Sequence, residues 1–385
     1  MKPSRFVLIV AIVVLFGSVL SVPEGRAGFS ERPVATGLDF PVAMAFSPDG
    51  RLFFTERFSG QVRLIADPTS AHPRLLPGAV YRFGPVSTFF ERGLLGLALD
   101  PDFQTNGRLY VYYSHRGRNS KTDPYRHRLM RITVKGDRGD APVALLDRLP
   151  IGSDSESGAG NHNGGILVFG PDGKLYLSIG ELATPGNSQN LDSFAGKILR
   201  LNPDGTAPTD NPFYDPKRPT SPRSYVYALG LRNSFGLTFG PGPPGQARLF
   251  ATENGPATND ELDLIEPGKN YGWDDDRVSG IRNKPGYVDP ILVYRRTIAP
   301  TGIVYYTGAG YPERYRGHLF FADWNEGRIR MVTLAGRDSV PAAGGAEDLF
   351  RHRGEGVVGL AAGPDGLLYF TTPKGIYRLV YDDAH

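Results

Sequence analysis

A short strand-turn-strand unit recurs six times in this chain, and it constrains the fold more than any other sequence feature. In one copy, Pro171, Asp172 and Gly173 separate residues 166–169 from residues 174–179, two runs of mostly β-branched, aromatic and aliphatic residues. Proline sets φ at the first corner, aspartate can bond to its own backbone and glycine accepts a positive φ, so the tripeptide predicts a tight turn between two strands. The turn glycines of the six copies are Gly50, Gly107, Gly173, Gly245, Gly317 and Gly366.

A further strand follows several of these copies after a short loop. These strands carry a polar or basic alternation and span residues 60–65, 128–134, 196–201, 327–332 and 375–380. Each repeat therefore has at least three strands, and the repeats predict an all-β, six-bladed β-propeller that occupies residues 28–385 as a single domain. Residues 30–36 are expected to pair with the last blade and close the ring. A pair of β-sandwiches is the alternative, but it would not require one turn at a repeated spacing.

The N-terminal segment predicts export. Lys2 and Arg5 precede an apolar run at residues 6–20, and a polar stretch follows that ends near Ala27. This order is typical of a secretory signal, so we expect residues 1–27 to be a signal peptide. The mature protein would then be periplasmic or secreted, without stable membrane insertion. An uncleaved anchor is the alternative, because the apolar run approaches membrane-spanning length.

Charge and cysteine content narrow the class of protein further. The formal net charge is only +3, and the basic residues are scattered along 385 residues. Neither nucleic acid nor a membrane surface is implied as a partner by such a distribution. The chain has no cysteine. An exported protein of this composition has no disulfides and must rely on its packed core.

Two motifs carry candidate catalytic side chains. His162 lies in a loop of asparagines and glycines directly before a predicted strand, where a substrate could approach it. Its role is either that of a general base or that of a structural hydrogen-bonding group. Arg232 and Asn233 follow an apolar run, and an arginine there could hold a developing oxyanion or a carboxylate. A salt bridge at the end of a strand is the alternative for Arg232.

Two further segments are candidates for a metal site and for the centre of the ring. Residues 253–263 form an oxygen-rich loop around Gly255 and Pro256, and such loops suit calcium, which accepts backbone carbonyls as well as carboxylates. The spacing is not that of an EF-hand, and capped turns would give a similar composition. Glu91 begins a glycine-containing segment at residues 91–96 and could face the axis, or the segment could serve only blade architecture.

Taken together and in this order, the motifs resemble the soluble glucose/sorbosone dehydrogenase family, whose members are pyrroloquinoline quinone (PQQ) dependent aldose sugar dehydrogenases on a six-bladed propeller. The resemblance covers about residues 35–380. It is carried by residues 91–96, His162 with the two glycines at 164 and 165, and residues 169–173, 196–200, 230–233, 253–256, 260–261 and 270–273.

The resemblance implies a function and assigns roles to several residues. It implies oxidation of the anomeric carbon of an aldose to a lactone by hydride transfer to PQQ, with a small-molecule sugar as substrate and an electron acceptor that stays open. His162 matches the general base of the family. Arg232 and Asn233 match residues that contact the quinone oxygens, and Arg232 would also stabilise charge during the reaction.

The cofactor and metal contacts implied by the resemblance involve four more residues. The backbone carbonyls of Gly255 and Pro256 match those that bind calcium, which also coordinates PQQ in the family. Thr297 matches a further cofactor contact, and Glu91 matches a polar residue of the site.

The sequence also departs from the family pattern. Asn325 stands where the characterised glucose dehydrogenases have a cofactor-binding lysine, and Gly356 and Val358 stand at their Arg-x-Arg pair. Because PQQ carries three carboxylates, losing three cations should weaken binding by several kcal/mol unless other cations replace them. The hypothetical replacements, which are close in sequence, are Arg328, Arg330, Arg351, His352 and Arg353. The Gly-Asp pair that usually follows the third repeat's strand is Gly180-Glu181 here.

Two other functions are compatible with a propeller of this kind. One is a calcium-dependent lactonase or esterase, in which the metal polarises the carbonyl and His162 acts as base. The other is a non-catalytic propeller that binds a glycan or a protein. The enzyme hypotheses require His162, Arg232, Asn233 and the pair Gly255-Pro256 to converge at one end of the axis.

Overall fold

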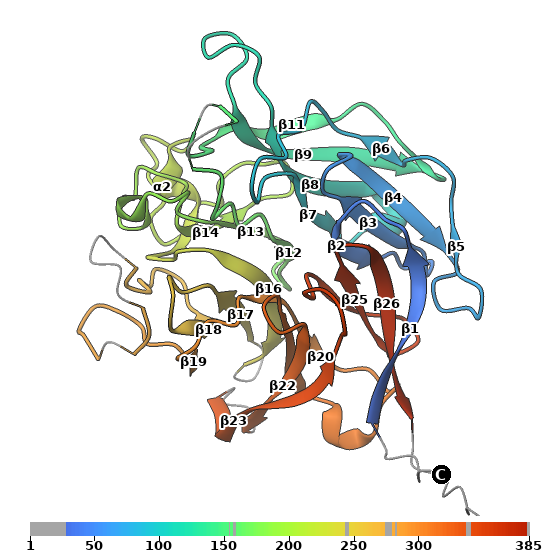
Figure 1. Cartoon of the computed structure of the whole chain (residues 1–385). Coiled ribbons are helices and arrows are strands. Elements are labelled where there is room, and N and C mark those ends of the chain that lie inside the picture. The colour runs from blue at the N-terminus through green and yellow to red at the C-terminus, as the bar shows by residue number, and fades with distance from the viewer. Residues whose placement is uncertain are drawn as a thin grey trace, which may run out of the picture.

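The computed structural model describes residues 28–153, 155–156, 159–242, 246–273, 279–281, 283–335 and 340–382. Within them, six antiparallel sheets are arranged around a central axis as the blades of a propeller (Figure 1). The six-bladed all-β architecture predicted from the repeats is therefore confirmed. The signal peptide predicted for residues 1–27 and the turn predicted at Gly245 lie outside the described residues.

The first three blades are built from strands β2 to β15. Blade 1 contains β2 (Pro41–Phe46), β3 (Leu52–Glu56), β4 (Gln61–Ala66), β5 (Arg74–Leu75) and β6 (Tyr81–Arg82). Blade 2 contains β7 (Leu94–Leu99), helix α1 (Phe103–Asn106), β8 (Arg108–His115), β9 (Arg126–Lys135), β10 (Arg138–Gly139) and β11 (Val143–Leu149). Blade 3 contains β12 (Leu167–Phe169), β13 (Leu175–Ile179), the 3-10 helix η1 (Pro185–Ser188), β14 (Lys197–Leu201), helix α2 (Pro222–Tyr225) and β15 (Val226–Leu229).

The last three blades repeat the plan and close the ring. Blade 4 contains β16 (Ser234–Pro241), β17 (Ala247–Glu253), β18 (Asp260–Ile265) and β19 (Leu292–Tyr294). Blade 5 contains β20 (Pro300–Tyr306), the 3-10 helix η2 (Glu313–Tyr315), β21 (His318–Asp323), β22 (Arg328–Ala335) and β23 (Val340–Arg351). Blade 6 contains β24 (Leu360–Ala362), β25 (Leu368–Thr372), β26 (Gly375–Asp382) and the N-terminal strand β1 (Gly28–Thr36).

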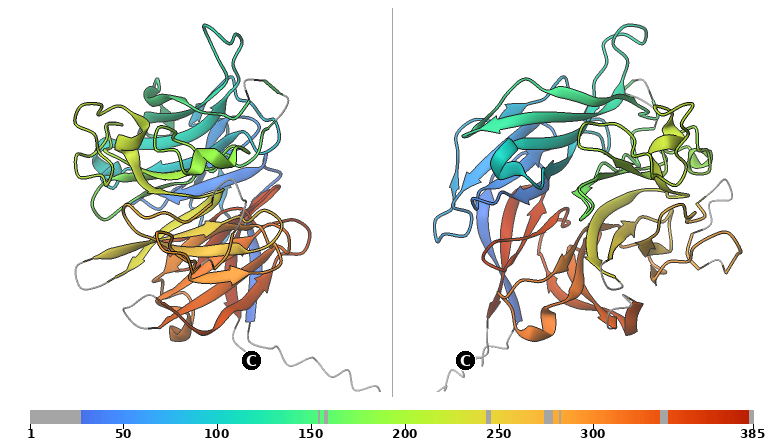
Figure 2. Two further views of the ribbon diagram at one scale, coloured as in Figure 1. Left: turned by 90° about the vertical axis from the view of Figure 1, so that its left-hand side faces the viewer. Right: turned by 180° about the vertical axis from the view of Figure 1, so that it is seen from behind.

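The predicted closure of the ring is confirmed by the pairing of β1 with β26. The two strands are antiparallel, and the register runs from Gly28 opposite Asp382 to Thr36 opposite Gly375. In both face-on views β1, in blue, lies beside β26, in red (Figure 1; Figure 2, right). Both ends of the described chain are thereby held in one sheet, which ties the first segment to the last.

The core lies between neighbouring blades. Strands β3, β13 and β25 are buried along their whole length, because each is the second strand of its blade and is covered on both faces by adjacent sheets. This explains why these segments are mostly apolar or aromatic on both faces and do not alternate with charged residues as a half-exposed strand would. No helix within the described residues is long and apolar enough to cross a membrane.

A β-bulge recurs at the start of the innermost strand in four blades. The register shifts between Pro41 and Met44 in β2, Leu94 and Gly96 in β7, Ser234 and Gly236 in β16, and Pro300 and Ile303 in β20. A bulge leaves an extra residue out of the ladder and re-aims its side chain. The bulges therefore decide which side chains reach the axis.

A buried threonine ties three of the blades to the bulge of the next blade. Thr55, Thr252 and Thr371 are each the penultimate residue of a second strand, and all three are fully buried. Their hydroxyls donate, respectively, to the backbone oxygen of Leu95 at 3.1 Å, of Thr301 at 2.6 Å and of Val42 at 3.1 Å. Each acceptor belongs to the following blade, so these bonds fix the bulges across the interfaces between blades.

We expect Thr252→Val to lower the free energy of unfolding by about 1–3 kcal/mol, because the buried carbonyl of Thr301 loses its hydroxyl donor. Urea denaturation at constant m-value measures the change. Thr220→Val, in an exposed loop, is the matched control and should stay within about 0.5 kcal/mol of the parent. Equal stability of the two variants would show that the tie between blades contributes nothing.

Candidate active site

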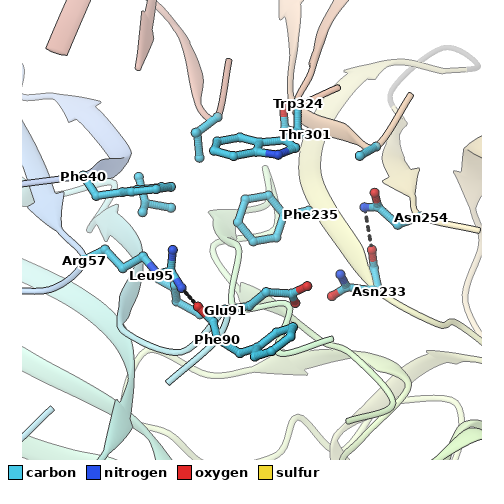
Figure 3. A pocket seen from close by; sticks show the side chains of 13 residues that line it. Phe40, Arg57, Phe90, Glu91, Leu95, Asn233, Phe235, Asn254, Thr301 and Trp324 are labelled. Atoms are coloured by element: carbon cyan, nitrogen blue, oxygen red, sulfur yellow. Dashed lines mark hydrogen bonds between the residues drawn. The ribbon is translucent and has the colours of Figure 1, made fainter. Parts of the chain in front are cut away.

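A cavity of about 500 Å³ opens at the end of the axis where the inner strands begin and the second strands end (Figure 3). Five of the six blades contribute to its wall, which is mostly aromatic and aliphatic with a few polar groups. The lining residues are Phe40, Val42, Arg57, Phe90, Glu91, Leu95, Asn233, Phe235, Asn254, Ala299, Thr301, Trp324 and Val358. Segments far apart in sequence thus form one pocket.

Two positions of the blade repeat supply most of this lining. The first is the bulge of the inner strand, which contributes Val42, Leu95, Phe235 and Thr301. The second is the residue directly after the second strand, which contributes Arg57 after β3, Asn254 after β17 and Trp324 after β21. None of these residues was predicted individually from the sequence, although Leu95 and Asn254 fall within the candidate segments at 91–96 and 253–263. Aligning the repeats on the ends of their second strands would have indicated the second group.

His162 lies beside this cavity and is bonded to Glu91, which precedes blade 2, and to Arg232, which precedes blade 4. Its backbone is in the left-handed region at φ 58°, and its N–H donates to Oε2 of Glu91 at 2.7 Å. The imidazole Nδ1 contacts a carboxylate oxygen of Glu181, whose side chain is only 1% exposed. Nε2 lies 2.8 Å from Nη2 of Arg232 and 3.0 Å from Nδ2 of Asn161.

The partners of the imidazole define its tautomer. The guanidinium of Arg232 and the amide nitrogen of Asn161 are donors only, so Nε2 of His162 must accept and carries no proton. The proton is then on Nδ1, where it is donated to Glu181. An imidazole held this way keeps Nε2 unprotonated, with its lone pair accepting from Arg232 and Asn161, and has a buried carboxylate at Nδ1, which is the arrangement of an oriented general base. Glu181, seen in the sequence only as a departure from Gly-Asp, is therefore part of the site.

Arg232 and Asn233 are held by one buried carboxylate. The backbone N–H of Arg232 donates to Oε1 of Glu253 at 3.1 Å, and the N–H of Asn233 donates to the same oxygen. Burial raises the pKa of Glu253 to about 7. Nη1 of Arg232 donates to the backbone oxygen of Asn254 at 2.9 Å, and Oδ1 of Asn233 accepts from the N–H of Gly164 at 3.1 Å. Arg232 and Asn233, which were predicted as a pair, therefore both contact the loop of His162, through His162 and Gly164 respectively.

Asp260 organises the segments that carry Gly255 and Thr297. This buried carboxylate accepts from the N–H of Gly255 at 2.8 Å and from the hydroxyl of Thr297 at 2.8 Å. It also accepts from the N–H of Ala299 at 2.8 Å. The hydroxyl of Thr297 is thus bonded to Asp260, while Ala299 and Thr301 form the cavity wall in this segment.

The loop around Gly255 can offer calcium backbone oxygens but few free carboxylates. Gly255 is buried and Pro256 is exposed, and Asp260 already accepts four internal hydrogen bonds. Within the described parts of the chain, no three histidine or acidic side chains come together in a way that could hold a metal. A calcium ion here would need oxygens from a bound molecule or from water to complete its usual six to eight ligands.

The hypothetical replacement cations lie elsewhere. Arg330 is buried on β22, the third strand of blade 5, and its Nε lies 2.7 Å from Oδ1 of Asp348. Arg328, on the same strand, pairs with Glu326 at 3.1 Å. The cavity lining contains neither of them, nor Arg351, His352 or Arg353.

The positions of the family's Arg-x-Arg pair instead help to build an apolar wall. A Cβ at Gly356 would lie 2.5 Å from the indole of Trp324, so only glycine lets this ring pack against the backbone. Val358 lines the cavity. Asn325, at the position of the family's lysine, donates to the backbone oxygen of Thr297 at 3.2 Å.

A buried polar network supports the loop of His162 from behind. Asn163 donates to the backbone oxygen of Gly160 at 2.8 Å, so its Oδ1 is the atom that faces Nε2 of His127 at 3.0 Å. His127 is fully buried, and its Nδ1 lies 3.1 Å from the hydroxyl of Ser114. Arg92 is also fully buried and donates to four backbone oxygens at residues 151–159. These contacts fix the segment that leads into His162.

The His127 network predicts a loss of stability in acid. Burial, assisted by the charge of Arg92, lowers the pKa of His127 to about 3. The unfolded histidine titrates near 6.5, so the unfolded chain binds the extra proton first and stability falls as pH drops below about 6.5. At pH 5 the loss through this residue should be about 2 kcal/mol relative to pH 7. Urea unfolding of the parent and of His127→Gln at both pH values measures it, and parallel pH dependence of the two proteins would contradict the assignment.

Comparisons with known proteins agree with this architecture. The family described as glucose/sorbosone dehydrogenase matches residues 38–380. Quinoprotein glucose dehydrogenase B of Acinetobacter calcoaceticus is 33% identical over 67% of this chain and 55% of its own length. The aldose sugar dehydrogenase YliI of Escherichia coli strain K12 is 28% identical over 89% of this chain and 90% of its own. The PQQ-bound aldose sugar dehydrogenase of Streptomyces coelicolor has a TM-score of 0.73 at 29% identity, and the match covers 93% of this chain and 99% of that structure.

Proposed function

The chain belongs to the glucose/sorbosone dehydrogenase family, and on this premise we propose that it oxidises the anomeric carbon of an aldose to a lactone with PQQ as its cofactor. The observation that carries the proposal is the oriented imidazole of His162, whose backbone N–H is bonded to Glu91 in the cavity wall. Its Nε2 is an unprotonated acceptor, and its Nδ1 is bonded to buried Glu181. A relative named as a quinoprotein and a PQQ-bound solved structure support the choice of cofactor.

The residues around the cavity fit a planar, anionic cofactor. Phe40 and Trp324 stack at a centroid distance of 5.9 Å and an angle of 21°, and Phe235 and Phe90 add further aromatic surface. In Figure 3, Phe40 and Arg57 lie on one side of the view and Asn233 on the other, with Phe235 between Trp324 and Phe90. PQQ, when bound, supplies the two-electron oxidant that a sugar dehydrogenase needs.

The residues of this chain then have distinct roles in the proposed reaction. Nε2 of His162 takes the proton from the anomeric hydroxyl, and the carboxylate of Glu181 stabilises the imidazolium that forms. Arg232 and Asn233 provide donors where negative charge develops on oxygen. Glu91 holds the backbone of His162 in place through its N–H.

Calcium is part of the proposal through the backbone carbonyls of Gly255 and Pro256, with remaining ligands from the bound cofactor. Thr297 acts through Asp260 in this proposal and supports the wall at Ala299. The lactonase alternative would also use His162 as base, but it does not account for an aromatic cavity that has a guanidinium in its wall. The binding-module alternative does not account for the oriented imidazole.

The test is a titration of the purified, metal-free mature protein with PQQ and calcium, followed by dye reduction on addition of a range of aldoses. Saturable, calcium-dependent PQQ binding with sugar-driven dye reduction is expected. Lactone hydrolysis without quinone is measured in parallel. No PQQ binding at tens of micromolar, or hydrolysis alone, would overturn the proposal.

A further inference from the structure

Among the residues that the structure describes, Arg57 is the only arginine or lysine in the lining of the central cavity, and its position is fixed. It directly follows β3, and its guanidinium carbon lies 4.8 Å from the ring centre of Phe40 and 4.7 Å from that of Phe58. Nε donates to the backbone oxygen of Arg92 at 3.0 Å, and one terminal nitrogen donates to that of Phe90. The side chain is therefore held in one orientation without a ligand.

No carboxylate of the described residues lies within ion-pair distance of Arg57, although the charge of Glu91 acts on it. Within the described residues its hydrogen bonds go only to the two backbone oxygens, and its other terminal nitrogen, Nη1, makes none. Its neighbour Arg63, by contrast, pairs with Glu56 at 3.3 Å. Burial lowers the pKa of Arg57, while the charge of Glu91 opposes this shift. A partly buried cation without an ion pair is costly, and an anionic ligand would remove that cost.

The aromatic surface around Arg57 is exposed. The large hydrophobic side chains that are exposed in the described residues include Phe58 at 42%, Phe90 at 67% and Trp324 at 41%, and all three lie at this cavity or beside Arg57. Exposed aromatic faces next to a guanidinium suit a flat conjugated molecule that carries a carboxylate. A neutral sugar would not need such a cation.

A second arginine without an ion pair lies across the axis. The blades follow chain order around the ring, so blade 1, which carries Arg57, is opposite blade 4, which carries Arg232. In the part of the chain that the structure describes, the side chain of Arg232 bonds to His162 and to the backbone of Asn254 and to no carboxylate. One guanidinium, that of Arg57, thus lies in the cavity lining at blade 1, and that of Arg232 lies outside this lining, bonded to His162.

We infer that Arg57 binds a carboxylate of the quinone cofactor and so orients it, with the carboxylate end at blade 1 and the reactive end at His162 and Arg232. This inference rests on the proposed function. It assigns a cofactor-binding role to a residue that no sequence motif indicated, and it explains how the site can hold an anionic cofactor although Asn325, Gly356 and Val358 supply no charge.

The test is equilibrium binding of PQQ and of its trimethyl ester, whose carboxylates are uncharged, to the parent protein and to Arg57→Gln. We expect the variant to lose about 10–100-fold in affinity for PQQ and less than about threefold for the ester, since only the acid can pair with the guanidinium. Arg57→Lys keeps the positive charge but loses the paired N–H donors of the guanidinium. Its affinity should fall about fivefold for PQQ and stay unchanged for the ester. Arg63→Gln, on the same blade but outside the lining, should bind both ligands as the parent does.

The outcomes separate the inference from the function on which it rests. Equal losses for PQQ and ester in Arg57→Gln, or no loss for either, would overturn the role of Arg57 while the proposed function stands. If Arg57→Gln does not fold, Arg57→Lys decides by the same comparison between acid and ester. A parent protein that binds neither ligand would instead refute the proposed function.

Discussion

Replacing His162 with asparagine is expected to lower kcat by about 10³-fold, within the range that a general base contributes. Asparagine is chosen because it tolerates the left-handed backbone that His162 adopts at φ 58°, whereas alanine would add strain at this position. Its amide cannot take a proton from the sugar hydroxyl. Dye-linked turnover of an aldose at saturating PQQ gives kcat.

Two controls distinguish lost chemistry from lost structure. The His162→Asn variant should keep its affinity for PQQ within about threefold and its free energy of unfolding within about 1 kcal/mol, because the contact of the backbone N–H with Glu91 is retained. His72→Asn changes an exposed loop histidine and should leave kcat unaltered. If His162→Asn turned over sugar within threefold of the parent, His162 would not be the base.

The repeats allowed the sequence to predict most of the fold. A strand-turn-strand unit with a glycine in the turn recurs six times, and this number predicted six blades. The first strand was expected to pair with the last blade, and β1 does pair with β26. The predictions at His162, Arg232 and Asn233 fall on loops at one end of the axis, since each lies directly before an inner strand. Their side chains and backbones meet within hydrogen-bonding distance.

The rest of the site depends on details that a linear pattern does not show. Phe235 and Leu95 reach the cavity because a bulge turns them out of the ladder, and a bulge moves a side chain to a face that simple alternation does not predict. Arg57 belongs to none of the motifs that the sequence analysis singled out. Arg328 and Arg330 lie on the third strand of blade 5, one strand further from the axis than β21, and acidic neighbours already pair with them.

Replacing Glu181 with glutamine is expected to lower kcat by about 10²–10³-fold. The carboxylate keeps the proton of His162 on Nδ1 and so leaves Nε2 unprotonated, as the acceptor of the Arg232 donor. A glutamine can turn its NH₂ group toward Nδ1, which would move the proton to Nε2 and oppose the donor of Arg232. In either orientation it supplies no negative charge for the imidazolium. Because Glu181 is buried, solvent cannot replace that charge.

A double-mutant cycle tests whether Glu181 affects kcat through His162. Glu181→Gln should have almost no further effect on kcat in the His162→Asn background, because the two residues act as one unit. Glu181→Asp, which keeps the charge and restores the Gly-Asp pair of the resembled family, should retain kcat within about tenfold. Additive effects of Glu181→Gln and His162→Asn on kcat would mean that the carboxylate acts through the stability of the loop. In that case the Glu181→Gln variant would also have a lower free energy of unfolding than the parent.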